Sequence, residues 1–174
     1  MNNLHSKILI IEDDPGISGF LKTTVTAAGY DVIVTDSGKS ALQLIASHCP
    51  DCILLDLGLP DMDGCEIIRN VRSWSQMPII VISARSMEND KACALDEGAD
   101  DYVTKPFRVR ELISRIKANI RRSQVNSSSG EVMVFGAFRI DLTGHKVTKD
   151  GVNINLTPSE FRLFTILLKN KNQT

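Results

Sequence analysis

Side chains able to do chemistry follow four apolar stretches of this 174-residue sequence. In chain order they are Glu12-Asp13-Asp14, Asp56, Ser83 and Lys105. The carboxyl ends of parallel strands meet at one rim of an open α/β sheet, which is where such sheets bind ligands. If the apolar stretches are parallel strands, these carboxylates, one hydroxyl and one ammonium converge on a single site.

The chemistry of such a cluster is specific. Crowded carboxylates disfavour one another's ionisation unless they share a cation. Oxygen ligands in this number suit Mg²⁺, which keeps several waters and is usually completed by phosphate. Asp56 could then act as a carboxylate nucleophile toward phosphorus. Lys105 and Ser83 could bind phosphoryl oxygens, and such positioning and electrostatic stabilisation are what phosphoryl transfer mainly demands.

The strands that would position these groups are mostly unbroken apolar runs. Such runs are typical of parallel strands buried on both faces, whereas a half-exposed strand alternates apolar and polar residues. We predict strands over residues 8–11, 32–34, 52–55, 79–82 and 102–104.

Segments with helical periodicity separate the strands. Apolar residues recur at spacings of three and four, and glycines end the first and fourth segments. The predicted helices lie near residues 17–28, 41–45, 67–71, 88–97 and 112–120. A strictly alternating (βα)₅ series indicates an α/β fold with a doubly wound parallel sheet and right-handed crossovers.

The sequence changes character after Arg122. Residues 123–130 are small, polar and without period, which predicts a flexible linker. Beyond it, residues 133–135, 138–140 and 146–148 are typical of short antiparallel strands, with turns at 136–137, 143–144 and 150–151. Thr157-Pro158 with Glu160 then predicts a helix start. We therefore divide the chain at 1–122, 123–130 and 131–174.

Composition excludes several classes of protein. The apolar runs are too short to span a membrane, the first seven residues do not resemble a signal peptide, and the net charge is −1. We expect a cytoplasmic protein without general affinity for nucleic acid. Cys49 and Cys52 lie close together beside His48, but matching ligands for a metal are lacking elsewhere. We expect Cys52 to pack as a small apolar residue.

The motifs around the four strand ends resemble the receiver domain of two-component response regulators. They are Ile-Ile-Glu12-Asp13-Asp14, Leu-Leu-Asp56-Leu-Gly-Leu-Pro60-Asp-Met-Asp-Gly64, Val-Ile-Ser83-Ala84-Arg85 and Gly98-Ala-Asp-Asp-Tyr102-Val-Thr-Lys105-Pro106-Phe107. The match covers residues 7–122. Leu156-Thr-Pro-Ser-Glu-Phe161 resembles the start of the winged-helix effector domain of the OmpR/PhoB subfamily. Short segments, among them residues 72–75 and 83–86, are most similar to the branch that controls potassium transport.

This resemblance implies a flavodoxin-like receiver fold and a set of residue roles. Asp56 would be the phosphoacceptor, supplied by the phosphohistidine of a sensor histidine kinase and assisted by Lys105. Mg²⁺ would be held by Asp13, Asp56 and the carbonyl of Gly58, with Glu12 acting through water. Ser83 and Tyr102 would be the switch pair, and the Lys105–Pro106 peptide bond would be cis. Asp14 instead suits the first helix N-terminus.

The family also implies a homodimer through the fourth helix, fifth strand and fifth helix. Charged residues that could serve it are Lys91, Asp100, Asp101, Glu111, Arg115 and Arg122, although surface pairs of this kind are weak. A complete winged helix continues into a recognition helix that reads the major groove. This sequence ends earlier, so the resemblance implies a truncated winged-helix fragment. We expect it to expose apolar surface, to be less stable than the receiver, and to have lost specific DNA binding.

Two other classes of protein share part of this pattern. A haloacid-dehalogenase-like phosphohydrolase also uses an aspartate nucleophile and Mg²⁺, but it needs an acid two residues later, where this chain has Gly58. A flavodoxin-like cofactor binder needs a Gly-, Ser- or Thr-rich phosphate loop after the first strand, whereas Glu12-Asp13-Asp14 would repel a phosphate. A phosphoaccepting receiver, which is not an enzyme in the usual sense, fits the residues best.

Overall fold

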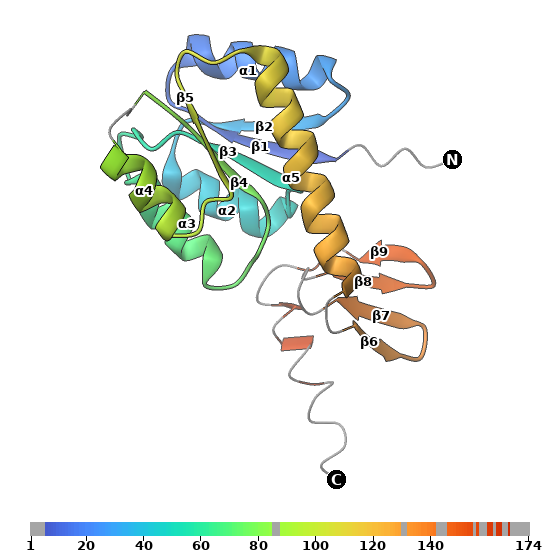
Figure 1. Cartoon of the computed structure of the whole chain (residues 1–174). Helices are drawn as coiled ribbons and strands as arrows, with labels where there is room; N and C mark the ends of the chain where they lie inside the picture. The colour runs from blue at the N-terminus through green and yellow to red at the C-terminus, as the bar shows by residue number, and fades with distance from the viewer. Residues whose placement is uncertain are drawn as a thin grey trace.

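A parallel sheet forms the larger part of the molecule (Figure 1). The computed structural model describes residues 6–84, 88–129, 132–141, 146–154, 156, 160–161, 163–164 and 167, with the backbone alone for 124–129. Within these ranges the sheet has the order β2-β1-β3-β4-β5. The strands are β1 (Lys7–Ile11), β2 (Asp31–Thr35), β3 (Cys52–Leu55), β4 (Ile79–Ser83) and β5 (Asp101–Thr104). All of the predicted strands are confirmed, and four of them extend one or more residues beyond the predicted limits.

The order of the strands brings the reactive ends together. β1 lies between β2 and β3, so that Ile11 is in register with Thr35 on one side and Leu55 on the other. β4 continues the sheet beyond β3, and Ser83 is in register with Thr104 of β5. The chain reverses its winding direction between β1 and β3, and in such sheets this is the place where ligands bind.

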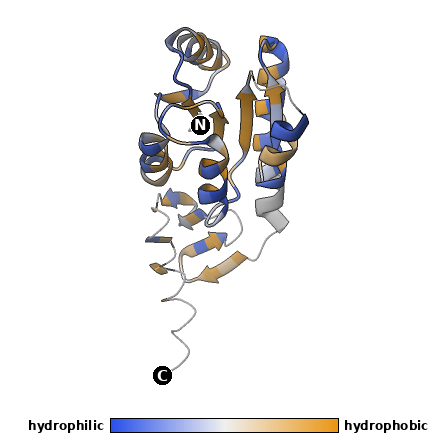
Figure 2. Ribbon diagram, turned by 90° about the vertical axis from the view of Figure 1, so that its left-hand side faces the viewer, coloured by the Kyte–Doolittle hydropathy of each residue, from blue (hydrophilic) through white to orange (hydrophobic). Residues whose placement is uncertain are grey.

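Helices cover both faces of the sheet and complete two separate cores. α1 (Pro15–Ala27) and α5 (Val109–Ser129) pack on one face, over Ile8, Ile10 and Leu54. α2 (Gly38–His48), α3 (Gly64–Arg72) and α4 (Glu88–Asp96) are on the other, where Leu9 and Leu55 lie. Successive strand residues therefore point to opposite cores, which explains the continuous apolar runs. Figure 2 shows that these strands are largely hydrophobic, whereas the helices carry both hydrophobic and hydrophilic residues.

The predicted linker at residues 123–130 is wrong for 123–129, because α5 continues without a break to Ser129. A helix that is already formed can add residues without a new nucleation step. This segment contains neither glycine nor proline before Gly130. The Ser123 hydroxyl also donates a hydrogen bond to the carbonyl of Ile120, which keeps the side chain on the helix surface. The polar composition of residues 123–129 therefore did not predict their helical backbone conformation.

A second, antiparallel sheet follows α5 and lies beside its end (Figure 1). Its strands are β6 (Val132–Phe135), β7 (Phe138–Asp141), β8 (Lys146–Lys149) and β9 (Val152–Ile154). The first three confirm the prediction, while β9 was not predicted. Asp150 and Gly151, between β8 and β9, have φ of 51° and 79°, and positive φ at both central residues is what a primed hairpin turn requires. The predicted turn at 143–144 and helix start at Thr157-Pro158 lie outside the described residues.

The antiparallel sheet has a small core. Ile140, Val147 and Phe161 are its buried apolar residues, whereas Val134 and Val152 are 71% and 69% exposed. The expected exposure of apolar surface is thus confirmed among the described residues.

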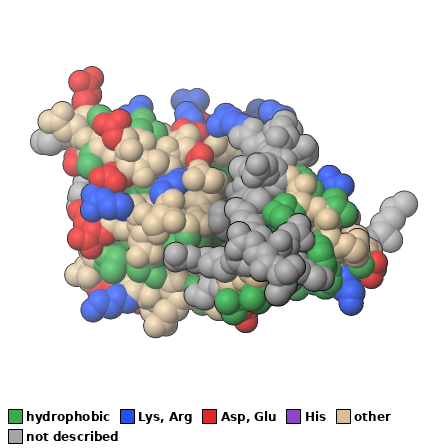
Figure 3. All heavy atoms as spheres, turned by 90° about the horizontal axis from the view of Figure 1, so that it is seen from below, with side chains coloured by type: hydrophobic (Ala, Val, Ile, Leu, Met, Phe, Trp, Pro, Cys, Tyr) green, Lys and Arg blue, Asp and Glu red, His purple; other side chains and the backbone are tan. Residues whose placement is uncertain are grey.

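Seen from below, the described part of the surface carries interspersed basic and acidic side chains (Figure 3). In the described part of the chain, no helix has the length and apolar character needed to cross a membrane.

Candidate functional site

The predicted site residues from three strands meet at the carboxyl edge of the parallel sheet. The Lys105 ammonium donates hydrogen bonds to Glu12 Oε2 at 2.7 Å and to Asp56 Oδ2 at 2.6 Å. Glu12 directly follows β1, Asp56 follows β3, and Lys105 follows β5. Residues that lie up to 93 positions apart therefore share one cation. The convergence predicted from the sequence is confirmed for these groups.

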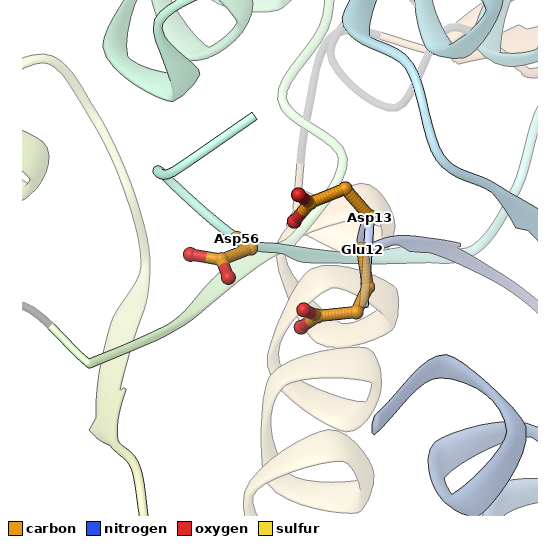
Figure 4. Close-up of side chains that lie close together, drawn as sticks. All are labelled: Glu12, Asp13 and Asp56. Atoms are coloured by element: carbon orange, nitrogen blue, oxygen red, sulfur yellow. The ribbon is translucent and has the colours of Figure 1, made fainter. Parts of the chain in front are cut away.

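Asp13 completes a cluster of three carboxyl groups. One oxygen from each of Glu12, Asp13 and Asp56 lies within 4.8 Å of the other two. Figure 4 shows the carboxyl groups of Glu12 and Asp13 turned toward the side on which Asp56 lies. A cleft of about 350 Å³ opens beside them between α1 and the end of β2, with Glu12, Asp13 and Asp36 in its lining.

The donor atoms of this cluster suit a hard divalent cation. All three side chains offer carboxylate oxygens, which are the ligands that Mg²⁺ prefers, and neither sulfur nor imidazole belongs to the group. Asp13 is exposed, so a bound ion could keep waters there. Glu12 is only 2% exposed and Asp56 12%. The residues present therefore fit Mg²⁺.

Burial and Lys105 act in opposite directions on the acidic groups. Burial raises the pKa of Glu12, and the hydrogen bond and charge of Lys105 oppose that shift without cancelling it. Burial also acts to raise the pKa of Asp56, but hydrogen bonds from Lys105 and the Gly58 amide outweigh it, so that this pKa lies below its usual value. The pKa of Lys105 is raised, because its two carboxylate partners outweigh its desolvation. At neutral pH, Asp56 is a carboxylate beside an ammonium.

Both oxygens of Asp56 have hydrogen-bond donors. Oδ2 accepts from Lys105, and Oδ1 accepts from the backbone N–H of Gly58 at 3.0 Å. The hydroxyl of Ser83, at the end of β4, also hydrogen-bonds to this carboxylate and contributes to its lowered pKa. The group is consequently fixed in orientation by contacts from three different parts of the chain.

The loop between β3 and α3 depends on Gly64. A Cβ atom added to Gly64 would lie 2.7 Å from Leu57 Cα and 3.1 Å from the carbonyl oxygen of Asp56. Side chains do not approach backbone that closely, so only glycine lets α3 begin against the residues that carry the site. Asp63 caps α3 by accepting from the Cys65 N–H at 2.8 Å.

Asp61 anchors the same loop to α2. Its carboxylate accepts hydrogen bonds from the Gly38 amide at 2.8 Å, the Lys39 amide at 3.1 Å and the Ser37 hydroxyl at 3.0 Å. These donors, the Gly38 amide first, lower the pKa of Asp61. The sequence analysis missed this role. A carboxylate within a Pro-Asp-x-Asp-Gly loop indicates a cap, but the spacing does not show that the capped helix is α2.

Asp14 caps α1 and takes no part in the carboxylate cluster. Its Oδ1 accepts from the amides of Gly16 and Ile17 at 2.8 and 2.9 Å, and Pro15 occupies the first turn. The prediction that Asp14 serves the helix N-terminus is confirmed. The predicted cis bond between Lys105 and Pro106 is also present.

Comparison with known proteins agrees with this geometry. Residues 8–117 match the family described as "Response regulator receiver domain". The chain belongs to the response-regulator family. It is 42% identical to the transcriptional regulatory protein KdpE of Mycobacterium tuberculosis over 167 residues, 95% of this chain and 74% of that protein. It is also 42% identical to the KDP operon regulator KdpE of Escherichia coli K12, over 95% of this chain and 73% of the relative. MtrA of Mycolicibacterium smegmatis, a DNA-binding response regulator, is 37% identical over 99% of this chain and 75% of that protein.

Solved receiver domains share the fold of this response regulator. The BeF₃-activated N-terminal receiver domain of Klebsiella pneumoniae RstA is 31% identical, with a TM-score of 0.65 over 67% of this chain and 99% of that domain. The receiver domain of the Pseudomonas aeruginosa sensor kinase PA1611, which has magnesium coordinated in its active-site cleft, is 29% identical, with a TM-score of 0.63 over 67% and 98%. Response regulators of this kind control transcription; their receiver domains bind Mg²⁺ at an acidic pocket and interact with sensor histidine kinases.

The residues of the predicted switch pair both lie inside the receiver. Ser83 is 1% exposed and contacts Asp56, whereas Tyr102 is 5% exposed and belongs to the core on the α2, α3 and α4 side. The structure thus places the hydroxyl at the site and the aromatic ring in the interior.

Most of the charged residues predicted to serve a dimer also make contacts within the chain. Asp100 accepts from Arg72 at 2.7 Å and from the Ile79 amide at 2.8 Å, which fastens α3 to β4. Arg115 donates to both oxygens of Asp101 at 2.9 Å and to Glu111 at 2.8 Å. Arg122 donates to Asn119, and Lys91 is exposed on α4. These contacts hold most of the charged side chains in place within the chain, and the dimer stays a prediction.

Among the residues that the structure describes, the group of possible metal ligands includes neither Cys49 nor Cys52. Cys52 is fully buried in the core beneath α1 and α5, and this burial raises the pKa of its thiol. Cys49 ends α2 at φ 44°, and its sulfur lies 3.3 Å from the carbonyl oxygen of Leu156. The prediction that Cys52 packs as an apolar residue is confirmed.

Proposed function

We propose that this chain is a phosphoaccepting receiver whose Asp56 takes a phosphoryl group from the phosphohistidine of a sensor histidine kinase, with Mg²⁺ as cofactor. The observation that carries this proposal is the Lys105 ammonium, held within 2.7 Å of both Glu12 and Asp56. An ammonium held between two carboxylates neutralises repulsion within the cluster. It also supplies a positive charge next to the nucleophile, where phosphoryl oxygens would arrive.

The proposed transfer forms one bond and breaks one bond. A carboxylate oxygen of Asp56 attacks phosphorus, and the phosphorus–nitrogen bond to the kinase histidine breaks, returning its electron pair to the imidazole. The lowered pKa of Asp56 keeps the attacking group ionised. Lys105 and Ser83, which already contact this carboxylate, are placed to bind the phosphoryl oxygens.

We assign the metal ligands to Asp13, Asp56 and the carbonyl of Gly58, with Glu12 acting through water. The oxygen-only donor set and the exposure of Asp13 support this assignment. When bound, Mg²⁺ would neutralise negative charge that accumulates on the transferring group. Lys105 supplies the positive charge that belongs to the chain itself.

The output of the receiver would follow from Ser83 and Tyr102. In this proposal, phosphorylation holds the Ser83 hydroxyl at the site and the Tyr102 ring inward, and so favours a homodimer through α4, β5 and α5. The contact between Ser83 and Asp56 and the burial of Tyr102 support it. Because Asp101, Glu111 and Arg115 already form an ion-pair network, a dimer would use them by exchanging partners.

The relatives suggest the signalling context. Identity of 42% to KdpE proteins, one of them named for the KDP operon, supports a role in the control of transcription, which we propose concerns potassium transport. We assign residues 1–122 to the receiver and 131–174 to the first part of a winged-helix domain.

The deciding experiment is incubation of the chain with Mg²⁺ and acetyl phosphate, followed by intact-mass spectrometry. We expect a mass gain of one phosphoryl group, which peptide mapping should locate at Asp56. Chelation of Mg²⁺ before the reaction should prevent this gain. Asp56→Ala should abolish the gain. Asp36→Asn is the matched control, because Asp36 lines the same cleft but is not in the carboxylate cluster.

Two results would contradict the proposal. A phosphoryl group retained in Asp56→Ala would place the acceptor elsewhere. Rapid multiple turnover of phosphate esters would favour the alternative, an Mg²⁺-dependent phosphohydrolase with the same nucleophile.

A further inference from the structure

Two thiols from different helices lie against each other on the face of the sheet that carries α2, α3 and α4. The sulfur of Cys65, in the first turn of α3, is 3.8 Å from the sulfur of Cys93 in the middle of α4. Neither thiol takes part in the carboxylate cluster. A disulfide needs two cysteines whose β-carbons approach closely, and the contact between the two sulfurs brings these side chains together.

The pairing of α3 with α4 is in register over a full helical turn. Arg69 lies four residues after Cys65, and Glu97 lies four residues after Cys93; these two residues form an ion pair with bonds at 2.5 and 3.0 Å. Residues four apart lie on the same face of a helix. The ion pair therefore aligns the helices so that the thiols meet one turn earlier.

A third contact strengthens this alignment. Arg72, at the end of α3, donates to the carbonyl of Gly98 at 2.8 Å and to Asp100 at 2.7 Å. Cys65, Arg69 and Arg72 thus each contact a residue located 28 positions further along the chain. The contact between the two sulfurs belongs to a continuous row of contacts that joins α3 to α4 and to the residues between α4 and β5.

The two thiols differ in their surroundings. Cys93 is exposed, whereas Cys65 is half-buried, and burial with the neighbouring Cys93 and Asp63 raises the pKa of Cys65 to about 12. A thiolate is the form that attacks disulfides and peroxides. Exposure gives Cys93 access to a reagent in solution. Cys65 is largely protonated at neutral pH, but its sulfur lies 3.8 Å from that of Cys93, so it can attack a mixed disulfide on Cys93 from within the protein as its proton is lost.

We propose that Cys65 and Cys93 form a reversible intrachain disulfide, a redox modification site that links α3 to α4, with oxidised glutathione or a similar small disulfide as the oxidant. The Cys93 thiolate attacks the glutathione disulfide, and a mixed disulfide forms as one glutathione leaves as thiolate. The Cys65 sulfur then attacks the Cys93 sulfur and releases the second glutathione. In total, two protein thiols are oxidised, one glutathione disulfide is reduced to two thiols, and the two protons of the protein thiols end on the two released glutathione sulfurs.

Such a link would restrict α4 relative to α3. In the chain, α4 lies between β4, which ends at Ser83, and β5, which contains Tyr102. The redox state of the two thiols would therefore affect a helix that the proposed dimer also uses. The proposal of the disulfide does not rest on phosphorylation, because neither sulfur contacts Asp56 or Lys105.

The test uses the whole reduced chain, treated with oxidised glutathione near neutral pH, then blocked with N-ethylmaleimide, digested and analysed by mass spectrometry. We expect a cross-linked peptide pair containing Cys65 and Cys93, reversed by dithiothreitol, with Cys49 and Cys52 recovered as thiols. The cross-link should form about ten or more times faster in the folded chain than in urea, because the fold holds the two sulfurs together.

Single variants test the order of steps. Cys65→Ser should accumulate a stable glutathione adduct on Cys93, and Cys93→Ser should abolish both adduct and cross-link. Cys49→Ser is the matched control and should leave the cross-link unchanged. The proposal is overturned if folded chain forms no intrachain cross-link, if only intermolecular dimers appear on a non-reducing gel, or if urea does not slow the reaction.

Discussion

The receiver and the C-terminal sheet bury their strands in different ways. β1, β3 and β4 lie inside the molecule with helices on both faces, and their side chains are almost completely buried. β6 to β9 have a core of Ile140, Val147 and Phe161 among the described residues, with Val134 and Val152 largely exposed. The first arrangement removes far more apolar surface from water for each residue than the second.

This difference shows why the candidate site is where it is. A cluster of three carboxylates and an ammonium needs a frame that does not move when charges repel or are desolvated. The doubly covered sheet supplies such a frame, because each site residue follows a strand whose apolar side chains are fixed by two cores. The antiparallel sheet presents no comparable acidic cluster among its described residues.

The largest expected difference between the two regions concerns the loss of a core side chain. Ile53→Ala, at a position with 0% exposure in β3, should lower the free energy of unfolding of the receiver by about 3–5 kcal/mol. Val147→Ala in β8 should act on the smaller core alone, weakening hydrogen-exchange protection in β6 to β9 while the receiver keeps its protection. Denaturant unfolding and hydrogen exchange of both variants test this. If Val147→Ala unfolds the receiver equally, the two regions form one cooperative unit.

A glycine substitution tests how closely the site depends on its frame. Gly64→Ala should destabilise the receiver by about 1–3 kcal/mol, because the new methyl group would overlap backbone of Leu57. It should also slow phosphorylation by acetyl phosphate, since the same contact includes the Asp56 carbonyl. Gly19→Ala is the control: nothing lies within 4 Å of a Cβ atom there, and alanine should stabilise α1 by about 1 kcal/mol. Equal melting temperatures for the two variants would contradict the close approach at Gly64.

The buried acid Glu12 gives a smaller effect whose size depends on pH. The pKa of Glu12 is raised in the folded chain, mainly by burial. Such a carboxyl group favours the fold below its unfolded pKa, and that contribution is lost as pH rises through the folded pKa. At pH 7, Glu12→Gln should therefore raise the melting temperature of the receiver, and the gain should shrink as the pH falls toward 4.

Substitution of Asp56 should change the melting temperature in the opposite direction. The folded pKa of this residue is lowered, so it stabilises the fold above its unfolded pKa and loses that contribution as the pH falls through the folded value. Asp56→Asn should lower the melting temperature at pH 7. Thermal scans at pH 4 and pH 7 compare the two variants, and shifts of the same sign would contradict the assigned roles of burial and Lys105.

The smallest effect is expected at the surface of α5. Arg115→Ala removes ion pairs with Asp101 and Glu111, but its side chain is 38% exposed. Water and salt screen such pairs, so the variant should lose less than about 1 kcal/mol, and less still in high salt. Chemical denaturation at two salt concentrations measures it. A loss comparable to Ile53→Ala would mean that this network carries more of the stability than its exposure suggests.

The sequence was sufficient for the alternation of strands and helices in the receiver, because buried parallel strands leave a strong pattern. It was also sufficient for the convergence of Glu12, Asp13, Asp56, Ser83 and Lys105, since strand ends in such a sheet meet at one rim. Contacts set by packing between helices were not predictable. The link from Asp61 to α2 and the meeting of Cys65 with Cys93 depend on helix positions that local spacing does not determine.

The extent of α5 was predicted wrongly for a related reason. Residues 123–129 have low helical preference as an isolated segment, and the structure continues the helix because the preceding turns are already formed. β9 was missed because Val152–Ile154 is short and only weakly apolar. In both cases the neighbouring structure determined the backbone conformation.

The length of α5 has a mechanical consequence. At a rise of about 1.5 Å per residue, the helix from Val109 to Ser129 is a rod of about 30 Å. Its first turns pack against the sheet, and its end lies beside β6 to β9 (Figure 1). A tilt of about 5° at the packed end would displace the far end by about 3 Å. The helix can thus act as a lever arm that amplifies a small rearrangement near β5 before it reaches the second sheet.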